Sequence, residues 1–441
     1  MVVGGDINMT AQLARRVLAI AFFSGLLPVS VHAASFDWQK YKGQTIEVLV
    51  DNNPIGRVIE ENAASFERLT GITVNVDTFT EQQMRQRLVT ALDSNSDQVD
   101  VFMTLPSREG EQFAAAGWYT DLTPMTTDVS QTYDFAGLSP ALLKAATIDG
   151  KLTSIPMNIE GPVLYYRQDI LTKCGVAVPK TLADLELAAQ KIKACDPSVT
   201  PFVSRGLRDA LAYTYSAFFH NMGGHYIVDG KSGLCSAPGL AALALYGDLQ
   251  NKYGPLGVVN YSFYQISALY RDGRAAMAFE SSNELSDIMQ GGARLADTGI
   301  TLLPPGPGGS HPIAINWGLA ISPYSAHKGA SWYLIQWATS PQMQAKNELA
   351  GIAAPRAAIA QDAMVRAWLK AQAVRMQLQD AVRSFATIGT SNVGYPIVDN
   401  PESRQYIGDA VDNVILGTQS PASACATANA SLNSLITKDG G

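Results

Sequence analysis

The chain has 441 residues, of which 47% are apolar and 16% are charged, so it lacks the low hydrophobicity and high charge of a disordered protein. Its 39 acidic and 32 basic residues give a net charge of -7, and no stripe of Lys and Arg follows the chain, which argues against nucleic acid as a partner. One hydrophobic core rarely organises more than about 250–300 residues, so at least two lobes are expected.

An export signal is predicted at the amino terminus. Arg15 and Arg16 precede an apolar stretch over residues 17–31, which is shorter than the roughly 20 residues that a membrane span needs. The small residues Val31 and Ala33 occupy the two positions that a signal peptidase reads. We therefore expect cleavage after Ala33 and release of the mature chain into an exported compartment.

The four cysteines are expected to form disulfides, because an exported chain meets an oxidising compartment. Three complete pairings are possible among Cys174, Cys195, Cys235 and Cys425. Cys174 and Cys195 flank one predicted helix, so a local bridge between them is the first expectation. A pair of buried free thiols is the alternative.

Strands and helices alternate at the start of the mature chain. β-branched content, alternation and apolar residues at helical spacing distinguish the two kinds of element. This order implies a mostly parallel sheet, in which ligands bind beyond the carboxyl ends of the strands. The predicted elements are a strand over 44–50, a helix over 54–69 ended by Gly71, a strand over 72–77, a helix over 81–92 and a strand over 99–103.

Two hairpins and a series of further helices are predicted beyond residue 140. The pairs Asp149-Gly150 and Asp229-Gly230 are typical of tight hairpin turns. The other predicted elements are strands over 162–166 and 275–279, helices over 181–193 and 326–339, helices from Leu240, Ser262 and Ser281, and a loop over 304–309.

Catalytic and cofactor motifs are missing from the sequence, which contains no G-x-S-x-G, H-E-x-x-H or C-x-x-C pattern. Glu280 and Glu284 have the spacing of an acid/base pair on a helix, but we interpret them as one capping and one solvated carboxylate. Tyr165 and Tyr166 suggest ferric iron, yet consecutive side chains of a strand point to opposite faces. No cofactor and no metal site are therefore expected.

Several sequence blocks resemble the bacterial extracellular solute-binding proteins of the carbohydrate-transport group, which includes maltose-binding protein. They occur in the order of that family and cover roughly residues 44–416, behind the predicted signal peptide. The blocks are 99–124, which ends in AAGWYTDLTP, 149–156 with 165–169, 272–277 (DGRAAM), 317–322 (WGLAIS) and 354–356.

The resemblance implies an α/β, two-lobe periplasmic-binding-protein fold of type II with three hinge crossings and a solute held in the cleft between the lobes. It places the crossings near residues 156–160, 312–319 and 350–356. With a signal peptide over 1–33, the expected amino-terminal lobe is 34–157 plus 318–350, and the expected carboxyl-terminal lobe is 158–317 plus 351–441.

The same resemblance supplies candidate ligand-binding residues. Glu160 aligns with a sugar-contacting glutamate, and Tyr213 aligns with a sugar-stacking tyrosine. Further candidates are Asp51, Asn53 and Arg108 on loops where polar sugar contacts are made, and Arg356 at the third crossing.

Two positions depart from the maltose-binding pattern. Leu105 stands where an aromatic residue is found, and Asn283 occupies the place of a stacking tryptophan, which favours a smaller or more polar ligand than maltodextrin. Trp317 is the expected replacement platform, because an aromatic face suits the C–H face of a sugar.

The expected function is capture of a sugar, sugar alcohol or small glycoside in the periplasm by a monomer that hands it to the membrane permease of an ABC importer. Hinge closure around the ligand is expected. A receptor for a polyamine or ferric iron is the alternative, and a secreted glycan-active enzyme is a more distant one.

Overall fold

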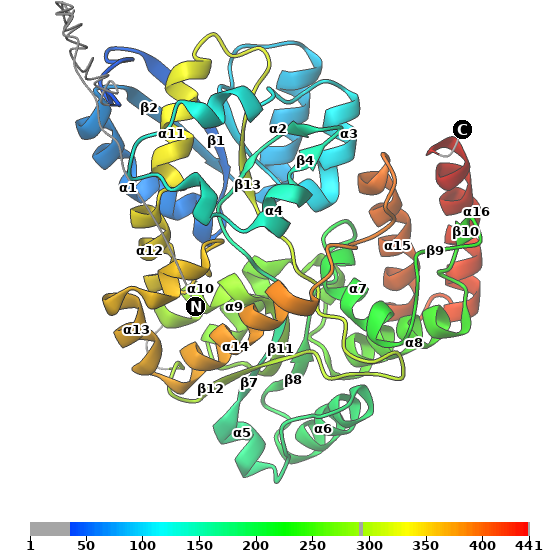
Figure 1. Cartoon of the computed structure of the whole chain (residues 1–441). Coiled ribbons are helices and arrows are strands. Elements are labelled where there is room, and N and C mark those ends of the chain that lie inside the picture. Colours follow the sequence, from blue (N-terminus) through cyan, green and yellow to red (C-terminus); the bar gives the residue numbers. More distant parts are fainter. Residues whose placement is uncertain (1–35, 291–293, 440–441) are drawn as a thin grey trace, which may run out of the picture. The chain divides into compact units, whose positions relative to one another are not determined.

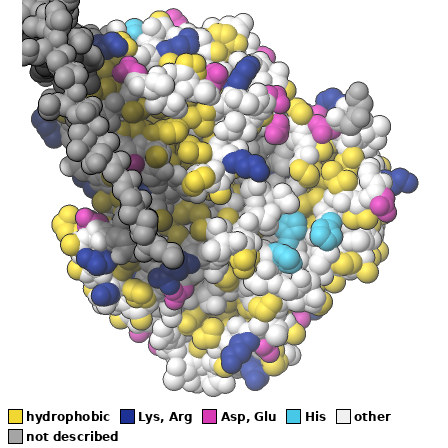
Figure 2. All heavy atoms as spheres, viewed as in Figure 1, with side chains coloured by type: hydrophobic (Ala, Val, Ile, Leu, Met, Phe, Trp, Pro, Cys, Tyr) yellow, Lys and Arg dark blue, Asp and Glu magenta, His cyan; other side chains and the backbone are white. Residues whose placement is uncertain are grey.

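The structure is a computed structural model that describes residues 36–290 and 294–439, so the predicted signal peptide and its cleavage after Ala33 lie outside the described residues. Two β-sheets organise the described chain (Figure 1). Among the described residues, no helix is both long and apolar enough to cross a membrane. Figure 2 shows one face of the molecule, on which Lys and Arg side chains are scattered among acidic and uncharged ones.

The first sheet has the strand order β2-β1-β3-β13-β6. Its first three strands are parallel, as predicted, and the βαβαβ order is confirmed. β13 runs antiparallel to β3, a difference from the mostly parallel expectation, because this strand returns from a connecting segment far along the chain. The strands are β1 (Thr45–Asp51), β2 (Thr73–Phe79), β3 (Val101–Thr104), β6 (Ile155–Pro156) and β13 (Gly318–Ile321).

Local capping fixes the helix that follows β1. Asn53 is its N-cap and accepts a 2.9 Å hydrogen bond from the backbone N–H of Gly56, and Gly71 ends it in the left-handed conformation, at φ 70°. The helices associated with the first sheet are α1 (Pro54–Thr70), α2 (Glu81–Asp93), α3 (Glu111–Ala115), α4 (Pro140–Ala145), α11 (Lys328–Ala338) and α12 (Pro341–Leu349).

The second sheet has the order β12-β7-β11-β8 and is mixed, since β7 is antiparallel to both of its neighbours and β11 is parallel to β8. Its strands are β7 (Pro162–Arg167), β8 (Thr200–Val203), β11 (Ala275–Ser281) and β12 (Thr298–Leu302). The remaining helices are α5 (Gln168–Lys173), α6 (Leu182–Cys195), α7 (Ala212–Asn221), α8 (Ala237–Tyr253), α9 (Phe263–Arg271), α10 (Leu285–Gln290), α13 (Ala363–Lys370), α14 (Ala373–Ile388), α15 (Asn400–Ile415) and α16 (Pro421–Asp439).

Both predicted hairpins are confirmed. In each, the Asp and the Gly have positive φ, 49° and 75° at Asp149-Gly150 and 51° and 73° at Asp229-Gly230, as a type I′ turn requires. The paired strands are β4 (Thr147–Ile148) with β5 (Lys151–Leu152), and β9 (Ile227–Val228) with β10 (Lys231–Ser232).

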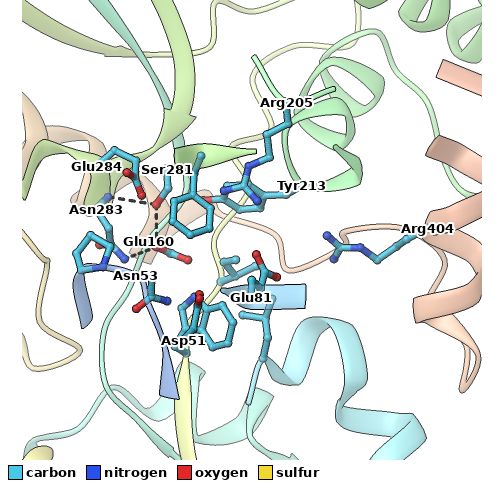
Figure 3. Close-up of a pocket in the computed structure, with 15 residues that line it drawn as sticks. Asp51, Asn53, Glu81, Glu160, Arg205, Tyr213, Ser281, Asn283, Glu284 and Arg404 are labelled. Carbon is cyan, nitrogen blue, oxygen red and sulfur yellow. Dashed lines mark hydrogen bonds between the residues drawn. The ribbon is translucent and has the colours of Figure 1, made fainter. Parts of the chain in front are cut away.

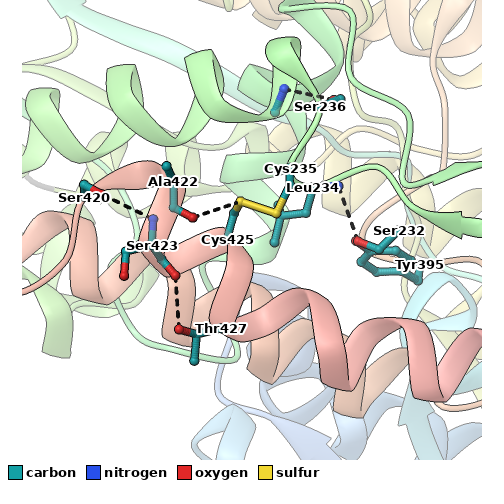
Figure 4. Close-up of a disulfide and its surroundings, with 11 residues drawn as sticks. Ser232, Leu234, Cys235, Ser236, Tyr395, Ser420, Ala422, Ser423, Cys425 and Thr427 are labelled. Atoms are coloured by element: carbon teal, nitrogen blue, oxygen red, sulfur yellow. Dashed lines mark hydrogen bonds between the residues drawn. A yellow bond between two sulfur atoms is a disulfide. The ribbon is translucent and has the colours of Figure 1, made fainter.

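Two disulfides fasten the chain. The predicted local bridge between Cys174 and Cys195 is confirmed. The second bridge joins Cys235, just before α8, to Cys425 in α16, and it spans 190 residues of sequence (Figure 4). This bridge fixes the carboxyl-terminal helix to the part of the chain that packs on the second sheet.

Three chain segments connect the two sheets and lie side by side. The backbone N–H of Met157 donates to the carbonyl of Trp317 at 2.8 Å, and that of Ile159 donates to the carbonyl of Ala353 at 3.0 Å. Glu160 and Ile315 exchange a pair of backbone hydrogen bonds of 2.9 and 2.8 Å. These are the segments in which the sequence predicted hinge crossings.

Candidate ligand-binding site

A small cavity, of about 30 Å³, lies beside the connecting segments and is lined by residues associated with both sheets (Figure 3). Loops at the carboxyl ends of β1 and β3 contribute to it, as the strand order predicted. The candidate residues that line it are Asp51, Asn53, Glu160, Tyr213, Asn283 and Trp317.

Asp51 ends β1 and is completely buried. Its Oδ1 accepts a hydrogen bond of 3.0 Å from the hydroxyl of Tyr264 in α9, an element associated with the second sheet. Burial and the nearby charge of Glu81 raise the pKa of Asp51 well above its ordinary value. A carboxyl group in this state can both donate and accept hydrogen bonds.

Glu160 lies in the first connecting segment and is also buried. Its Oε2 accepts hydrogen bonds from the hydroxyl of Ser281, at 2.8 Å, and from the side-chain amide of Asn283. Burial raises the pKa of Glu160 to about 7, although the hydrogen bond from Ser281 acts in the opposite direction. Both protonation states are therefore accessible near neutral pH.

Glu81, the first residue of α2, is held between two guanidinium groups. Its Oε1 accepts hydrogen bonds of 3.1 Å from Arg85 and from Arg108. Burial alone would raise its pKa, but the charges of these two arginines lower it to about 2. Glu81 is therefore ionised where it lines the cavity, and the positive charges of Arg85 and Arg108 neutralise it.

Arg205, after β8, forms a buried ion pair with Glu280 in β11. Nε of Arg205 donates to both carboxylate oxygens, at 3.0 and 2.9 Å, and Nη2 donates to Oε1 at 2.5 Å. The guanidinium lies over the ring of Tyr213, 4.7 Å from its centroid, and 5.5 Å from the centroid of Phe263. The ion pair thus positions an aromatic surface at the cavity.

The interpretation of Glu280 and Glu284 as a capping and a solvated carboxylate is wrong. Glu280 is the buried partner of Arg205, and Glu284 is also buried, lines the cavity and accepts a hydrogen bond from Ser267. Burial, together with the charge of Glu280, raises the pKa of Glu284 well above its ordinary value.

Several polar atoms at the cavity have no hydrogen-bond partner among the described residues. Arg404, in α15, extends toward Glu81 in Figure 3, and burial with the nearby charge of Arg108 lowers its pKa to about 9. A buried polar atom without a partner is unfavourable, so a set of them at one cavity indicates a place for a polar ligand. The unpartnered atoms are Oδ2 of Asp51, Oη of Tyr213, Oδ1 of Asn283 and Nη1 of Arg404.

Arg108 and Arg356 do not line this cavity. Arg108 donates to Glu81 and, at 3.0 Å, to Asp209 beyond it. Arg356 is 2% exposed and donates to the backbone carbonyls of Asp134 and Thr339. It therefore holds neighbouring backbone in place rather than reaching the cavity.

The sequence alone did not predict the contributions of Glu81, Arg205, Phe263 and Arg404 to the lining. Arg205 and Arg404 lie almost 200 positions apart in the sequence, and only the fold brings them to one cavity. Glu81 carried one signal, since it starts a helix directly after β2 at the ligand-binding edge of a parallel sheet.

The chain belongs to the bacterial extracellular solute-binding protein family, whose pattern matches residues 51–345. It is similar to an erythritol/L-threitol-binding protein of Mycolicibacterium smegmatis, with 25% identity over 340 residues that cover 72% of this chain and 71% of the relative. It is also 25% identical to a mannitol-binding protein of Pseudomonas aeruginosa, over 66% of this chain and 67% of the relative.

Solved structures show the same fold. A solute-binding protein of Agrobacterium radiobacter in complex with ribitol superimposes with a TM-score of 0.81 at 23% identity, over 89% of this chain and 99% of that one. The architecture is therefore the α/β periplasmic-binding-protein fold that the sequence resemblance implied.

Proposed function

We propose that the chain is the solute-binding component of an ABC importer and that it captures an uncharged sugar alcohol or small sugar in this cavity. The observation that carries the proposal is the set of four buried polar atoms, on Asp51, Tyr213, Asn283 and Arg404, that have no hydrogen-bond partner within residues 36–290 and 294–439. They combine donors and acceptors, and hydroxyl groups can serve both. The polyols named for the relatives and for the ribitol complex support this ligand class.

Charge balance at the site supports an uncharged ligand. Four guanidinium groups face four carboxylates at and around the cavity, and Glu160, whose pKa is about 7, adds at most one negative charge. These groups therefore offer little excess charge to a ligand with a net charge. Burial also raises the pKa values of Asp51 and Glu284, which reduces the negative charge that they contribute. The balanced groups are Arg85, Arg108, Arg205 and Arg404 against Glu81, Glu109, Asp209 and Glu280.

An amine is the second candidate ligand, because four carboxyl groups line the cavity: Asp51, Glu81, Glu160 and Glu284. An ammonium group would favour the ionised forms of Asp51, Glu160 and Glu284. Against this candidate, Arg205 and Arg404 line the same cavity and would repel a cation.

Binding is proposed to close two lobes, 34–157 with 318–350 and 158–317 with 351–441, around the ligand. A ligand that contacts both lobes stabilises the closed arrangement relative to the open one. The bond from Tyr264 to Asp51 joins residues of the two proposed lobes and would be made on closure. The loaded monomer would then dock on the membrane permease in the periplasm, after export and cleavage behind Ala33.

A ligand panel tests the proposed function. We expect alditols of four to six carbons to raise the melting temperature of the mature protein, because a ligand at 100 times its Kd stabilises by about 2.7 kcal/mol. Linear diamines and aldonates of matched length are the charged controls and should give smaller shifts. Stabilisation by the diamines alone would favour the amine receptor, and no stabilisation by any alditol or sugar would contradict the proposal.

Trp317→Ala is expected to weaken polyol binding by about 1–3 kcal/mol, through lost apolar contact. Trp317 lines the cavity, and the guanidinium of Arg85 lies 5.2 Å from the centroid of its ring. Titration calorimetry measures the change, and circular dichroism checks the fold. Unchanged affinity in a folded variant would remove Trp317 from the binding surface.

The affinity is also expected to depend on the protonation of Glu160. Two donors already occupy Oε2, so a ligand hydroxyl that donates to Oε1 would favour the ionised form. Binding should then weaken by up to about tenfold per pH unit below the pKa of about 7, and protons should be released on binding near neutral pH. Calorimetry at pH 6 and 8 tests this dependence.

Glu160→Gln is the control, and it should bind more weakly at pH 8 and lose the contribution of this residue to the pH dependence. The opposite result, tighter binding by the wild type at pH 6, would mean that the protonated carboxyl donates to the ligand.

A further inference from the structure

A second cavity, of about 200 Å³, adjoins the first. Its lining comes from the loop after β3, from α4, from the second connecting segment and from the chain before α15. The two cavities share Ile315. Along α15, Asn400 lines the second cavity and Arg404, four residues later, lines the first.

Arg108 stands where the two cavities meet. It is 8% exposed and lines the second cavity, while its Nη1 donates at 3.1 Å to Glu81, which lines the first. Its Nη2 donates at 3.0 Å to Asp209, whose backbone carbonyl accepts from Nε of Arg404 at 3.3 Å. The guanidinium therefore closes the gap between α2 and the chain that follows β8.

The second cavity can itself hold hydroxyl groups. Oγ of Ser107 and Oδ1 of Asn400 are buried and have no hydrogen-bond partner among the described residues. Its lining also includes the polar residues Asn316 and Ser391. It thus has the chemistry for a second sugar unit but is separated from the first cavity by charged side chains.

We propose that Arg108 determines the length of the ligand: its ion pairs with Glu81 and Asp209 end the first cavity and confine the ligand to one polyol or one sugar ring. This inference rests on the proposed function. Arg108 and Asp209 belong to different proposed lobes, so their bond forms on closure. A ligand that extends past the first cavity would occupy the position of the guanidinium, leave buried charges without partners and oppose closure.

The first cavity is the smaller of the two, at about 30 Å³ against about 200 Å³ for the second. Without the guanidinium the two cavities would become continuous, and a glycosylated alditol could place its sugar beside Ser107 and Asn400. Arg108→Ala should therefore shift the selectivity of the protein toward longer ligands.

The experiment compares sorbitol with maltitol, which is sorbitol bearing one glucosyl unit, by titration calorimetry on the mature protein. For the wild type we expect sorbitol to bind at least 100-fold more tightly than maltitol. In Arg108→Ala this preference should fall by at least tenfold. Arg108→Gln keeps a shorter hydrogen-bond donor, so its preference for sorbitol over maltitol should lie between those of the wild type and Arg108→Ala. This variant provides the test if Arg108→Ala does not fold.

Ala145→Trp supplies a matched control, because Ala145 is exposed on α4 and lines only the second of the two cavities. Added to Arg108→Ala, it should fill the second cavity and restore most of the preference for sorbitol. In the wild-type background it should leave sorbitol binding unchanged.

The outcomes separate this inference from the proposed function. A wild type that binds no alditol or sugar of the panel contradicts the proposed function. A wild type that binds an alditol, but whose preference for it over its glucosylated form is the same in Arg108→Ala, overturns the length-determining role of Arg108. If sorbitol itself does not bind, the tightest alditol and its glucosylated form replace the pair.

Discussion

Replacing Arg205 with Met is expected to lower the free energy of unfolding by about 3–5 kcal/mol, because it leaves the carboxylate of Glu280 buried without its partner. Glu280 is 1% exposed, and all three of its bonds to Arg205 would be lost. Urea denaturation at pH 7 measures the change. The same variant should lose ligand affinity, since the guanidinium also packs on Tyr213 at the cavity.

The control is the double variant Arg205→Met with Glu280→Gln. Removing the unpaired charge should recover a large part of the lost stability, because most of the penalty comes from the buried ion rather than from lost packing. A single variant destabilised by less than about 1 kcal/mol would contradict the importance of this ion pair.

The second large effect is expected on stability, when the disulfide between Cys235 and Cys425 is removed. Replacing both cysteines with Ser should lower the free energy of unfolding by about 2–5 kcal/mol, because the bridge closes a 190-residue loop and restricts the unfolded chain. Denaturant unfolding of the two proteins under non-reducing conditions measures the difference. The variant should also expose α16 to proteolysis, since the bridge fastens that helix near α8 (Figure 4).

The bridge between Cys174 and Cys195 is the natural comparison. It spans only 21 residues, so its double Ser variant should lose less stability on loop-closure grounds. An equal or larger loss from the short bridge would mean that native-state packing, rather than loop length, determines the contribution of each disulfide.

The sequence predicted elements whose signals are local. The helix from Pro54 carries its own N-cap at Asn53 and its own terminator at Gly71, and the two Asp-Gly turns specify their hairpins without help from the rest of the chain. β13 could not be oriented in this way, because its antiparallel pairing with β3 depends on the route of the connecting segment that precedes it.

Part of the cavity lining was predicted, because the resemblance marked residues of the connecting segments and of the loops after parallel strands. Glu160 and Trp317, which this route marked, line the cavity. Glu280 was interpreted as a capping or solvated residue, because its partner Arg205 lies 75 positions away and no periodicity links them. Arg356 was expected at the ligand, but its backbone partners Asp134 and Thr339 can be recognised only in the folded chain.

A crystal structure of the mature protein with its tightest-binding neutral polyol tests the central claim most directly. The account predicts a single ligand in the first cavity, with its oxygens within hydrogen-bond distance of Oδ2 of Asp51, Oη of Tyr213, Oδ1 of Asn283 and Nη1 of Arg404. It also predicts that the bonds of Arg108 to Glu81 and Asp209 are intact at the end of the ligand. A polyol bound elsewhere, or bound in this cavity without contacting those four atoms, would contradict the account.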